Sequence, residues 1–367
     1  MKINKDFRSR KNKNNVKSSF LEIDLSAISN NIDILKTYCE SKTHFLAIVK
    51  ADAYGHGAVQ TAKKIASQVD WFAVNDVFEA KELRENDIAH PILVFMPPNK
   101  RTSIFYSDLN LTATVCEEEH LQLLPNGSKY HFLFDTGMGR LGFRPDEAKK
   151  VARLQTRYNS LTCTGLYSHF ATADQPNSPK LKEQLQLFKK LQKYFSGNLL
   201  THMCNTGAIS QIKEAHFDMV RSGIGIYGFS PGKVEIDGLR PAMKWRTHLI
   251  QVKRIEKGEC VSYGSTWRCP EDGFLGVIPV GFSDGLPRRL SGKLNAKIGS
   301  DYYSAAGIIT MNYTMVYLQK RNFKTGTEVL LLGGKYTARD WADTLGTIEY
   351  EIMTGIAKNP KRYIMLS

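Results

Sequence analysis

FLAIVKADAYGHG occupies residues 45–57. An unbroken apolar run that ends at a lysine and a Gly-rich turn is typical of a buried parallel strand leading into a polar loop. Seven similar runs follow along the chain, at 71–74, 92–95, 112–115, 131–134, 163–167, 202–204 and 219–221. Most precede a helical pattern, of which the clearest begins after Ser178 and stops at Gly197. Eight strand–helix units over about 200 residues predict an α/β fold, the (β/α)8 TIM barrel.

The segments on either side of these units have a different pattern. Residues 20–25 predict a strand, and Ser26 can cap the helix that follows it. Beyond Pro241 the chain predicts strands at 248–255, 274–279, 306–309, 315–318 and 328–332, with one helix at 337–345. We therefore expect a flexible basic tail over residues 1–17, a barrel over 18–240 and a mainly β C-terminal domain over 241–367.

Composition narrows the class of protein. Of the 367 residues, 42% are apolar and 23% are charged, which excludes wholesale disorder. The sequence has neither an apolar run of about 18 residues nor a secretory signal pattern, so we expect a cytoplasmic protein without membrane contact. Its six cysteines form no C-x-x-C pair, which predicts reduced thiols and no metal site.

The net charge of +14 raises the question of a nucleic-acid partner. Seven Lys or Arg against one Asp place +6 of that charge on residues 1–17. This tail has no apolar stripe, so a solvated arm is favoured over a nucleic-acid-binding arm. Charge alone is weak support for a nucleic-acid-binding protein.

Polar residues follow the predicted barrel strands at the edge where this fold carries its chemistry. Lys50 comes directly after the first strand, and an amine with apolar residues behind it can lose its proton and condense with a carbonyl. On Lys50 alone, an exposed lysine beside a turn is the simpler interpretation. The loops after strands seven and eight contain Thr206, Gly223 and Ile224, which are suited to binding a phosphate. A lysine that faces a phosphate site is what pyridoxal phosphate requires.

Several motifs in order resemble the alanine racemase family, the fold-type-III pyridoxal-phosphate enzymes, from about Leu21 to Tyr363. They are VKADAYGHG (49–57), DTGMGRLGF (135–143), YSHFATAD (167–174), RSGIGIYG (221–228), SYG (262–264), PVGFSDGLPRRL (279–290) and YEI (350–352). The resemblance implies a pyridoxal 5'-phosphate cofactor bound to Lys50 as an internal aldimine. It also implies a homodimer with shared active sites, in which Tyr263 of the partner subunit's β domain is the second base.

The remaining site residues are also implied by the resemblance. Arg221 would face the pyridine nitrogen with His202 behind it, and His169 would bond the catalytic tyrosine. Arg140 would bind the substrate carboxylate, and Met311 would line the substrate pocket. The phosphate would be held by Tyr54, Thr206, Gly223 and Ile224. Asn205 would be a further cofactor-binding residue. Removal of the α-proton from one face and return on the other requires two bases, here Lys50 and Tyr263.

Five positions depart from the family pattern. Leu133 stands where many members have a carbamylated lysine that braces the carboxylate-binding arginine. Asn312 replaces an aspartate, Ile308 an arginine and Phe282 a tyrosine near the substrate pocket or its entrance. Lys358 replaces a tyrosine that reaches the phosphate. These changes remove no catalytic base, but they alter the substrate pocket and its entrance.

We therefore expect an alanine racemase that interconverts L- and D-alanine and supplies D-alanine for peptidoglycan. A racemase of another small amino acid, such as serine, is the closest alternative. A fold-type-III decarboxylase or aldolase is disfavoured by the Ser262-Tyr263-Gly264 motif, and a non-enzymatic cofactor carrier by the β domain.

Overall fold

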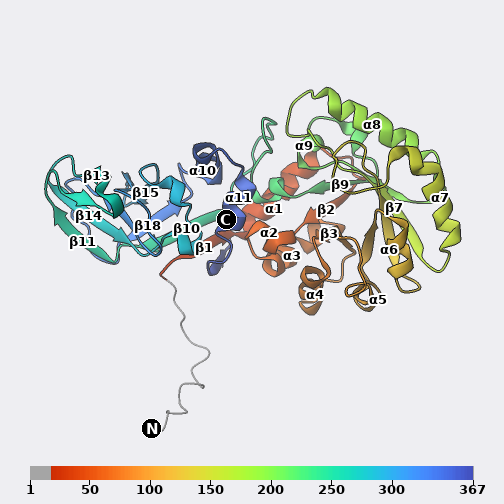
Figure 1. Ribbon diagram of the computed structural model, residues 1–367, viewed down its shortest axis with the longest axis horizontal. Helices are drawn as coiled ribbons and strands as arrows, with labels where there is room; N and C mark the ends of the chain where they lie inside the picture. Colours follow the sequence, from red (N-terminus) through yellow and green to blue (C-terminus); the bar gives the residue numbers. More distant parts are fainter. Residues whose placement is uncertain (1–17, 367) are drawn as a thin grey trace, which may run out of the picture. The chain divides into compact units, whose positions relative to one another are not determined.

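The computed structural model describes residues 18–366. Its chain divides into two compact units (Figure 1). The barrel unit consists of residues 24–242 and 363–366, and the β unit consists of residues 18–23 and 243–362. The basic tail predicted at 1–17 lies outside the described residues.

Eight parallel strands form the barrel unit's sheet, in the order β8-β7-β6-β5-β4-β3-β2-β9. Backbone N–H groups of Asp218 and Arg221 donate to the carbonyls of Thr201 and Cys204, at 3.1 and 2.9 Å, and so connect the β9 side to the β8 side. The predicted (β/α)8 barrel is confirmed. Its strands are β2 (His44–Ile48), β3 (Trp71–Val74), β4 (Ile92–Val94), β5 (Thr112–Val115), β6 (Lys129–Leu133), β7 (Thr162–Tyr167), β8 (Leu200–His202) and β9 (Met219–Ser222).

Helices lie around the outside of these strands, as α4 to α8 show in Figure 1. The barrel unit's helices are α1 (Leu25–Thr37), α2 (Lys50–Tyr54), α3 (Ala58–Ile65), α4 (Val77–Glu85), α5 (Ile104–Asp108), α6 (Glu118–Leu123), α7 (Ala148–Arg157), α8 (Pro179–Gln192) and α9 (Thr206–Ile209). Ser178 is the N-cap residue of α8, as predicted. The cap predicted for α1 is wrong, because Asp24 and not Ser26 accepts the first free N–H groups of that helix.

The β unit is built mainly from antiparallel strand pairs. One sheet has six strands in the order β16-β15-β18-β10-β1-β19, one has three in the order β11-β14-β17, and β12 pairs with β13. The strands are β1 (Phe20–Asp24), β10 (Met243–His248), β11 (Gln251–Ile255), β12 (Cys260–Val261), β13 (Trp267–Arg268), β14 (Gly273–Ile278), β15 (Asn295–Ile298), β16 (Asp301–Ser304), β17 (Thr314–Tyr317), β18 (Glu328–Leu332) and β19 (Lys361–Ile364). Two helices accompany them, α10 (Ala338–Leu345) and α11 (Glu349–Gly355).

The structure corrects the start of the barrel. Strand β1 buries only alternate residues and pairs antiparallel with β10, with Leu21 opposite Trp245. Residues 18–23 therefore belong to the β unit and not to the barrel, which begins at Asp24. The sequence could not show this, because the partner strand lies more than 200 residues further along the chain.

Other corrections fall within the β unit. The single strand expected at 248–255 is interrupted at Leu249 and Ile250, so that β10 and β11 belong to different sheets. The strand expected at 306–309 is wrong: Gly307 turns there with φ +75°. The β15–β16 hairpin and α11 were not predicted, because their short, largely polar segments lack a clear apolar period.

Among residues 18–366, no helix has the length and apolar character needed to cross a membrane.

Candidate active site

Lys50 begins a turn with an unusual backbone. The four residues after it, Ala51 to Tyr54, all have left-handed φ values of 51–53°. Two carboxylates hold the turn: Glu79 accepts from the N–H of Ala51 at 2.6 Å, and Asp52 accepts from the N–H of Ala58 at 2.8 Å. Left-handed geometry costs about 1–2 kcal/mol per non-glycine residue. The surrounding fold therefore fixes the lysine in a conformation that the sequence alone does not prefer.

The environment of the Lys50 amine favours its neutral form. Burial lowers the pKa of Lys50, and the positive charge of Arg140 lowers it further, while Glu79 opposes the change. The Nζ atom lies 5.6 Å from the centre of the Phe95 ring. A partly desolvated amine of this kind can act as a nucleophile or as a base.

Arg221 is a buried cation that forms its hydrogen bonds with neutral groups. Its Nη1 lies 2.8 Å from Nδ1 of His202, and its Nη2 donates to the carbonyl of Ser168 at 2.9 Å. Since an arginine only donates, Nδ1 of His202 accepts, and the Nε2–H of His202 donates to Nδ1 of His131 at 2.9 Å. Burial lowers the pKa of Arg221 to about 10, so it is still charged at neutral pH. This chain of bonds fixes the histidine tautomers behind the guanidinium group.

His169 follows β7 and faces the same group. Its Nδ1 lies 3.2 Å from Nη2 of Arg221. Burial, followed by the charges of Arg221, Arg140 and Lys50, lowers the pKa of His169 to about 3. His169 is therefore a neutral hydrogen-bonding group at neutral pH and does not act as a cation.

The predicted phosphate residues meet beyond β8 and β9. Gly223 has no room for a side chain, because a Cβ atom there would lie 2.4 Å from the hydroxyl oxygen of Tyr54. The Gly223 N–H donates to the hydroxyl of Thr206 at 3.1 Å, and Ile224 begins the short turn that follows. Asn205 is the N-cap residue of α9, and its Oδ1 atom is buried and has no hydrogen-bond partner among the described residues. A buried polar atom beside a glycine cradle is suited to a polar ligand.

Arg140 lies on a loop that its own chain organises. One Oδ1 atom of Asp135 accepts from the N–H groups of Gly137, Met138 and Gly139 at 2.8–3.0 Å. Leu133 packs in an apolar cluster with Cys116, Tyr167 and Phe95. Within residues 18–366, no carboxylate forms an ion pair with Arg140, whose side chain is exposed. The loop backbone, and not a residue at position 133, therefore sets the position of Arg140.

The β unit carries the other predicted residues. The Tyr263 side chain is 71% exposed, and Ser262 before it has φ 69° and donates its hydroxyl to the carbonyl of Ile308 at 2.6 Å. Met311 is exposed as well, and the amide of Asn312 donates to the hydroxyl of Ser283 at 2.9 Å. Lys358 is exposed.

Ten of the twelve predicted residues thus lie in the barrel unit: His202 and Arg221 lie within β8 and β9, and the other eight follow barrel strands. Tyr263 and Met311 lie on the β unit. Sequence reasoning missed Glu79, His131, Tyr227 and Gln184. The ring of Tyr227 lies 4.9 Å from that of Tyr54, centre to centre, at an angle of 34°, and its hydroxyl donates to the carbonyl of Ile48 at 2.8 Å. Two of these residues had a sequence signal: Tyr227 lies in the RSGIGIYG motif, and Gln184 is a polar residue within the apolar stripe of α8. No group of three His, Cys, Asp or Glu in the described part of the chain is arranged to hold a metal ion.

Two family models match the chain: the N-terminal domain of alanine racemase over residues 23–231, and its C-terminal domain over residues 242–364. The chain belongs to the alanine racemase family. The alanine racemase of Carboxydothermus hydrogenoformans is 34% identical over 364 residues, which cover 94% of this chain and 98% of the relative. Alanine racemase 1 of Clostridium acetobutylicum is 32% identical over 378 residues, with 95% and 96% covered.

Solved alanine racemase structures have the same fold. The structure from Clostridium difficile 630 matches with a TM-score of 0.90 and 30% identity over 96% of this chain and 97% of that one. The Bacillus anthracis structure, solved with bound L-Ala-P, matches with a TM-score of 0.88 and 31% identity over 96% of both chains. Membership of the alanine racemase family makes this chain an isomerase, an amino-acid racemase.

Proposed function

We propose that this chain interconverts L- and D-alanine with pyridoxal 5'-phosphate bound at the barrel mouth. The observation that carries the proposal is the position of Lys50, whose pKa is lowered by burial, at the end of the barrel that also holds Arg221, His169 and Arg140. An amine nucleophile, a buried cation and a carboxylate-binding cation are the groups that such a reaction needs.

The residues present fit the cofactor. Two features mark the end that would hold the phosphate. One is the Oδ1 of Asn205, which has no hydrogen-bond partner within residues 18–366, and the other is the cradle at Gly223, where Tyr54 leaves no space for a side chain. Thr206 and Ile224 complete that end, and Lys50 would hold the other end covalently. When bound, the cofactor supplies a carbonyl that condenses with amines and a conjugated ring that accepts electron density from the α-carbon.

The barrel residues then orient the substrate. Arg221 would donate to the ring nitrogen, and because its pKa is about 10 it keeps its own proton at neutral pH. His202 and His131 hold that guanidinium group in place. Arg140 would bind the substrate carboxylate with a guanidinium group that no carboxylate of the described residues neutralises.

Racemisation needs a proton acceptor on each face of the substrate. We assign one face to Nζ of Lys50 and the other to the hydroxyl of Tyr263 from a partner subunit, with His169 bonded to that tyrosine. Met311 would line the pocket.

We also propose that the chain forms a homodimer with shared active sites. Large apolar side chains are exposed on each unit, which a monomer in water would not favour. On the barrel unit they include Phe78, Met96, Ile104, Met138 and Leu141, and on the β unit Tyr263, Phe282, Met311 and Tyr313. A dimer that brings the β unit of one subunit to the barrel mouth of its partner would cover both sets.

Reductive labelling tests the cofactor assignment. Protein incubated with pyridoxal phosphate should show an imine absorbance band, and borohydride should remove the band and leave the label on the Lys50 peptide. A chiral assay over the common small amino acids, serine included, then identifies the substrate. A label on another lysine, or the absence of bound cofactor, would contradict the assignment of Lys50. Faster conversion of serine than of alanine would contradict the choice of substrate.

The cellular role is part of the same proposal. We propose that the enzyme works in the cytoplasm and supplies D-alanine for peptidoglycan. Deletion of the gene in its host should then create a requirement for D-alanine, unless a second racemase is present, and fractionation should recover the protein with the cytoplasm.

A further inference from the structure

Gln184 is a fully buried polar residue on a helix that otherwise packs through apolar side chains. On α8 it shares the inward face with Leu181, Leu185 and Phe188, and its exposed fraction is 0%. Burial of an amide costs about 1–3 kcal/mol unless its hydrogen bonds are made. An apolar residue would pack here without that cost, so the amide needs another explanation.

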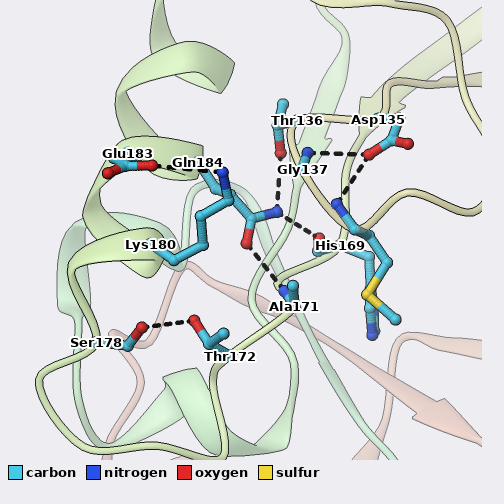
Figure 2. Close-up of polar contacts among 11 residues, drawn as sticks. Asp135, Thr136, Gly137, His169, Ala171, Thr172, Ser178, Lys180, Glu183 and Gln184 are labelled. Carbon is cyan, nitrogen blue, oxygen red and sulfur yellow. Dashed lines mark hydrogen bonds and ion pairs between the residues drawn. The ribbon is translucent and has the colours of Figure 1, made fainter.

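The side chain of Gln184 is bonded at both ends (Figure 2). Its Oε1 accepts from the N–H of Ala171 at 2.9 Å, and its Nε2 donates to the carbonyl of His169 at 2.9 Å and to the hydroxyl of Thr136 at 3.3 Å. The amide orientation is fixed, because the N–H of Ala171 can only donate and the carbonyl of His169 can only accept. Both Nε2 protons are therefore used.

These bonds join two different loops. Thr136 belongs to the loop after β6, which carries Arg140, whereas His169 and Ala171 belong to the segment after β7. The hydroxyls of Thr136 and Ser168 lie 2.7 Å apart and form a second link between the loops. A further contact from α8 reaches the first loop, because Lys180 covers Gly137 so closely that a Cβ atom there would lie 2.9 Å from Cε of Lys180.

The β7 segment is held from two sides. On the barrel side, Nη2 of Arg221 donates to the carbonyl of Ser168 and contacts Nδ1 of His169. On the helix side, Gln184 holds the carbonyl of His169 and the N–H of Ala171. His169 is thus held at its imidazole by Arg221, a group of the reaction site, and at its backbone carbonyl by Gln184, a group outside it.

We propose that Gln184 is a positioning residue for racemisation, which fixes the Arg140 loop and the His169 segment relative to one another. The inference rests on the proposed function, in which Arg140 binds the substrate carboxylate and His169 orients one of the two bases. Gln184 touches neither the substrate nor the cofactor, and it acts only through these two loops.

Gln184→Met tests the proposal with a matched control on the same helix. Methionine has nearly the same length and volume but leaves the N–H of Ala171 and the carbonyl of His169 without their partner. Gln186→Met makes the same chemical change at an exposed position two residues away. We expect kcat/KM for alanine to fall at least tenfold in Gln184→Met and to stay within twofold of wild type in Gln186→Met.

Two further measurements separate positioning from general destabilisation. With α-deuterated L- and D-alanine, loss of His169 orientation should change the isotope effect in one direction only, because a different base removes the proton in each direction. Thr136→Val breaks the link to the Arg140 loop and leaves the His169 bond intact. It should therefore raise KM without changing either isotope effect.

Hydrogen exchange tests directly whether Gln184 holds the two loops together. In Gln184→Met, amides of residues 135–142 and 168–173 should exchange faster than in wild type, while those of the turn at 205–210 keep their rates. Should Gln184→Met fail to fold, Gln184→Glu, which retains the acceptor for Ala171 but lacks the donor for His169, replaces it in the same three measurements.

Unchanged exchange in both loops, or isotope effects that shift equally in both directions, would overturn the positioning role. Equal losses in the two methionine variants would overturn it as well. A wild-type protein that does not racemise alanine would instead refute the proposed function, and the exchange comparison would still decide whether Gln184 joins the loops.

Discussion

Gly223→Ala places one methyl group against the hydroxyl of Tyr54. The new Cβ atom would lie 2.4 Å from that oxygen and 3.0 Å from Cζ, whereas ordinary contacts begin near 3.4 Å. The overlap is therefore about 1 Å. Neither side yields easily, because Tyr54 is buried with its ring against that of Tyr227, and the N–H of Gly223 is bonded to Thr206.

Overpacking of this kind costs about 1–3 kcal/mol. At about 2–4 °C per kcal/mol for a unit of this size, Gly223→Ala should melt roughly 2–12 °C below wild type. Gly355→Ala is the control, because a Cβ atom there meets nothing within 4 Å and the residue lies in α11. It should melt at the wild-type temperature or slightly above, since alanine favours a helix over glycine.

Adding Tyr54→Phe to Gly223→Ala shows whether the hydroxyl of Tyr54 causes the loss of stability. Once the oxygen is removed, the closest atom to the new methyl group is Cζ at 3.0 Å, so the double variant should recover part of the stability that Gly223→Ala loses. Titration with pyridoxal phosphate, followed by absorbance, should show at least tenfold weaker binding in Gly223→Ala. A melting temperature within 1 °C of wild type, together with full cofactor affinity, would refute the steric argument.

Three further outcomes follow from the structure and the proposed function. Lys50→Ala and Tyr263→Ala should each be nearly inactive as homodimers, yet about one quarter of wild-type activity should return after subunit exchange. Half of randomly paired dimers are mixed, and each mixed dimer has one intact site of two. Verified heterodimers without activity would show that both bases come from one chain. The free energy of unfolding should fall as the pH drops from about 6.5 towards 3. The pKa of His131 is about 3 in the folded barrel and 6.5 in the unfolded chain, so the unfolded chain binds more protons in this range. His131→Asn should reduce that slope by up to about 1.4 kcal/mol per pH unit in urea denaturation between pH 4 and 6, and an unchanged slope would contradict the buried neutral histidine. Activity should not respond to added bicarbonate, because Leu133 packs in an apolar cluster where a carbamylated lysine would need polar partners; activation by bicarbonate would contradict this.

The barrel was predictable because its strands are buried on both faces. Such strands are apolar throughout, as in Ile92–Val94, and they stand out between amphipathic helices without any knowledge of their partners. Most predicted strand ends therefore fall within one or two residues of the observed ends. The residues after those ends could be proposed as a site because parallel strands direct them to the same edge.

The parts of the fold and of the site that could not be predicted depend on contacts that no local sequence pattern encodes. Strand β1 alternates like any half-buried strand, and only its pairing with β10 assigns it to the β unit. The support of the site was hidden for the same reason: Glu79 resembles any other acidic residue on a helix until its carboxylate is seen to accept from Ala51. Gln184 broke the apolar period of α8, but a broken period does not indicate which loops the side chain will join.

The left-handed turn after Lys50 has a consequence for protein design. Four non-glycine residues in this conformation cost about 4–8 kcal/mol, which is comparable with the net stability of many domains. If only residues 50–57 were copied onto another barrel, the new protein would have the unfavourable left-handed backbone without the groups that stabilise it. The graft would also need a carboxylate placed like Glu79, the contact from Asp52 to the next helix, and an aromatic partner like Tyr227. The reactive lysine is therefore portable only together with its supports from three other parts of the barrel.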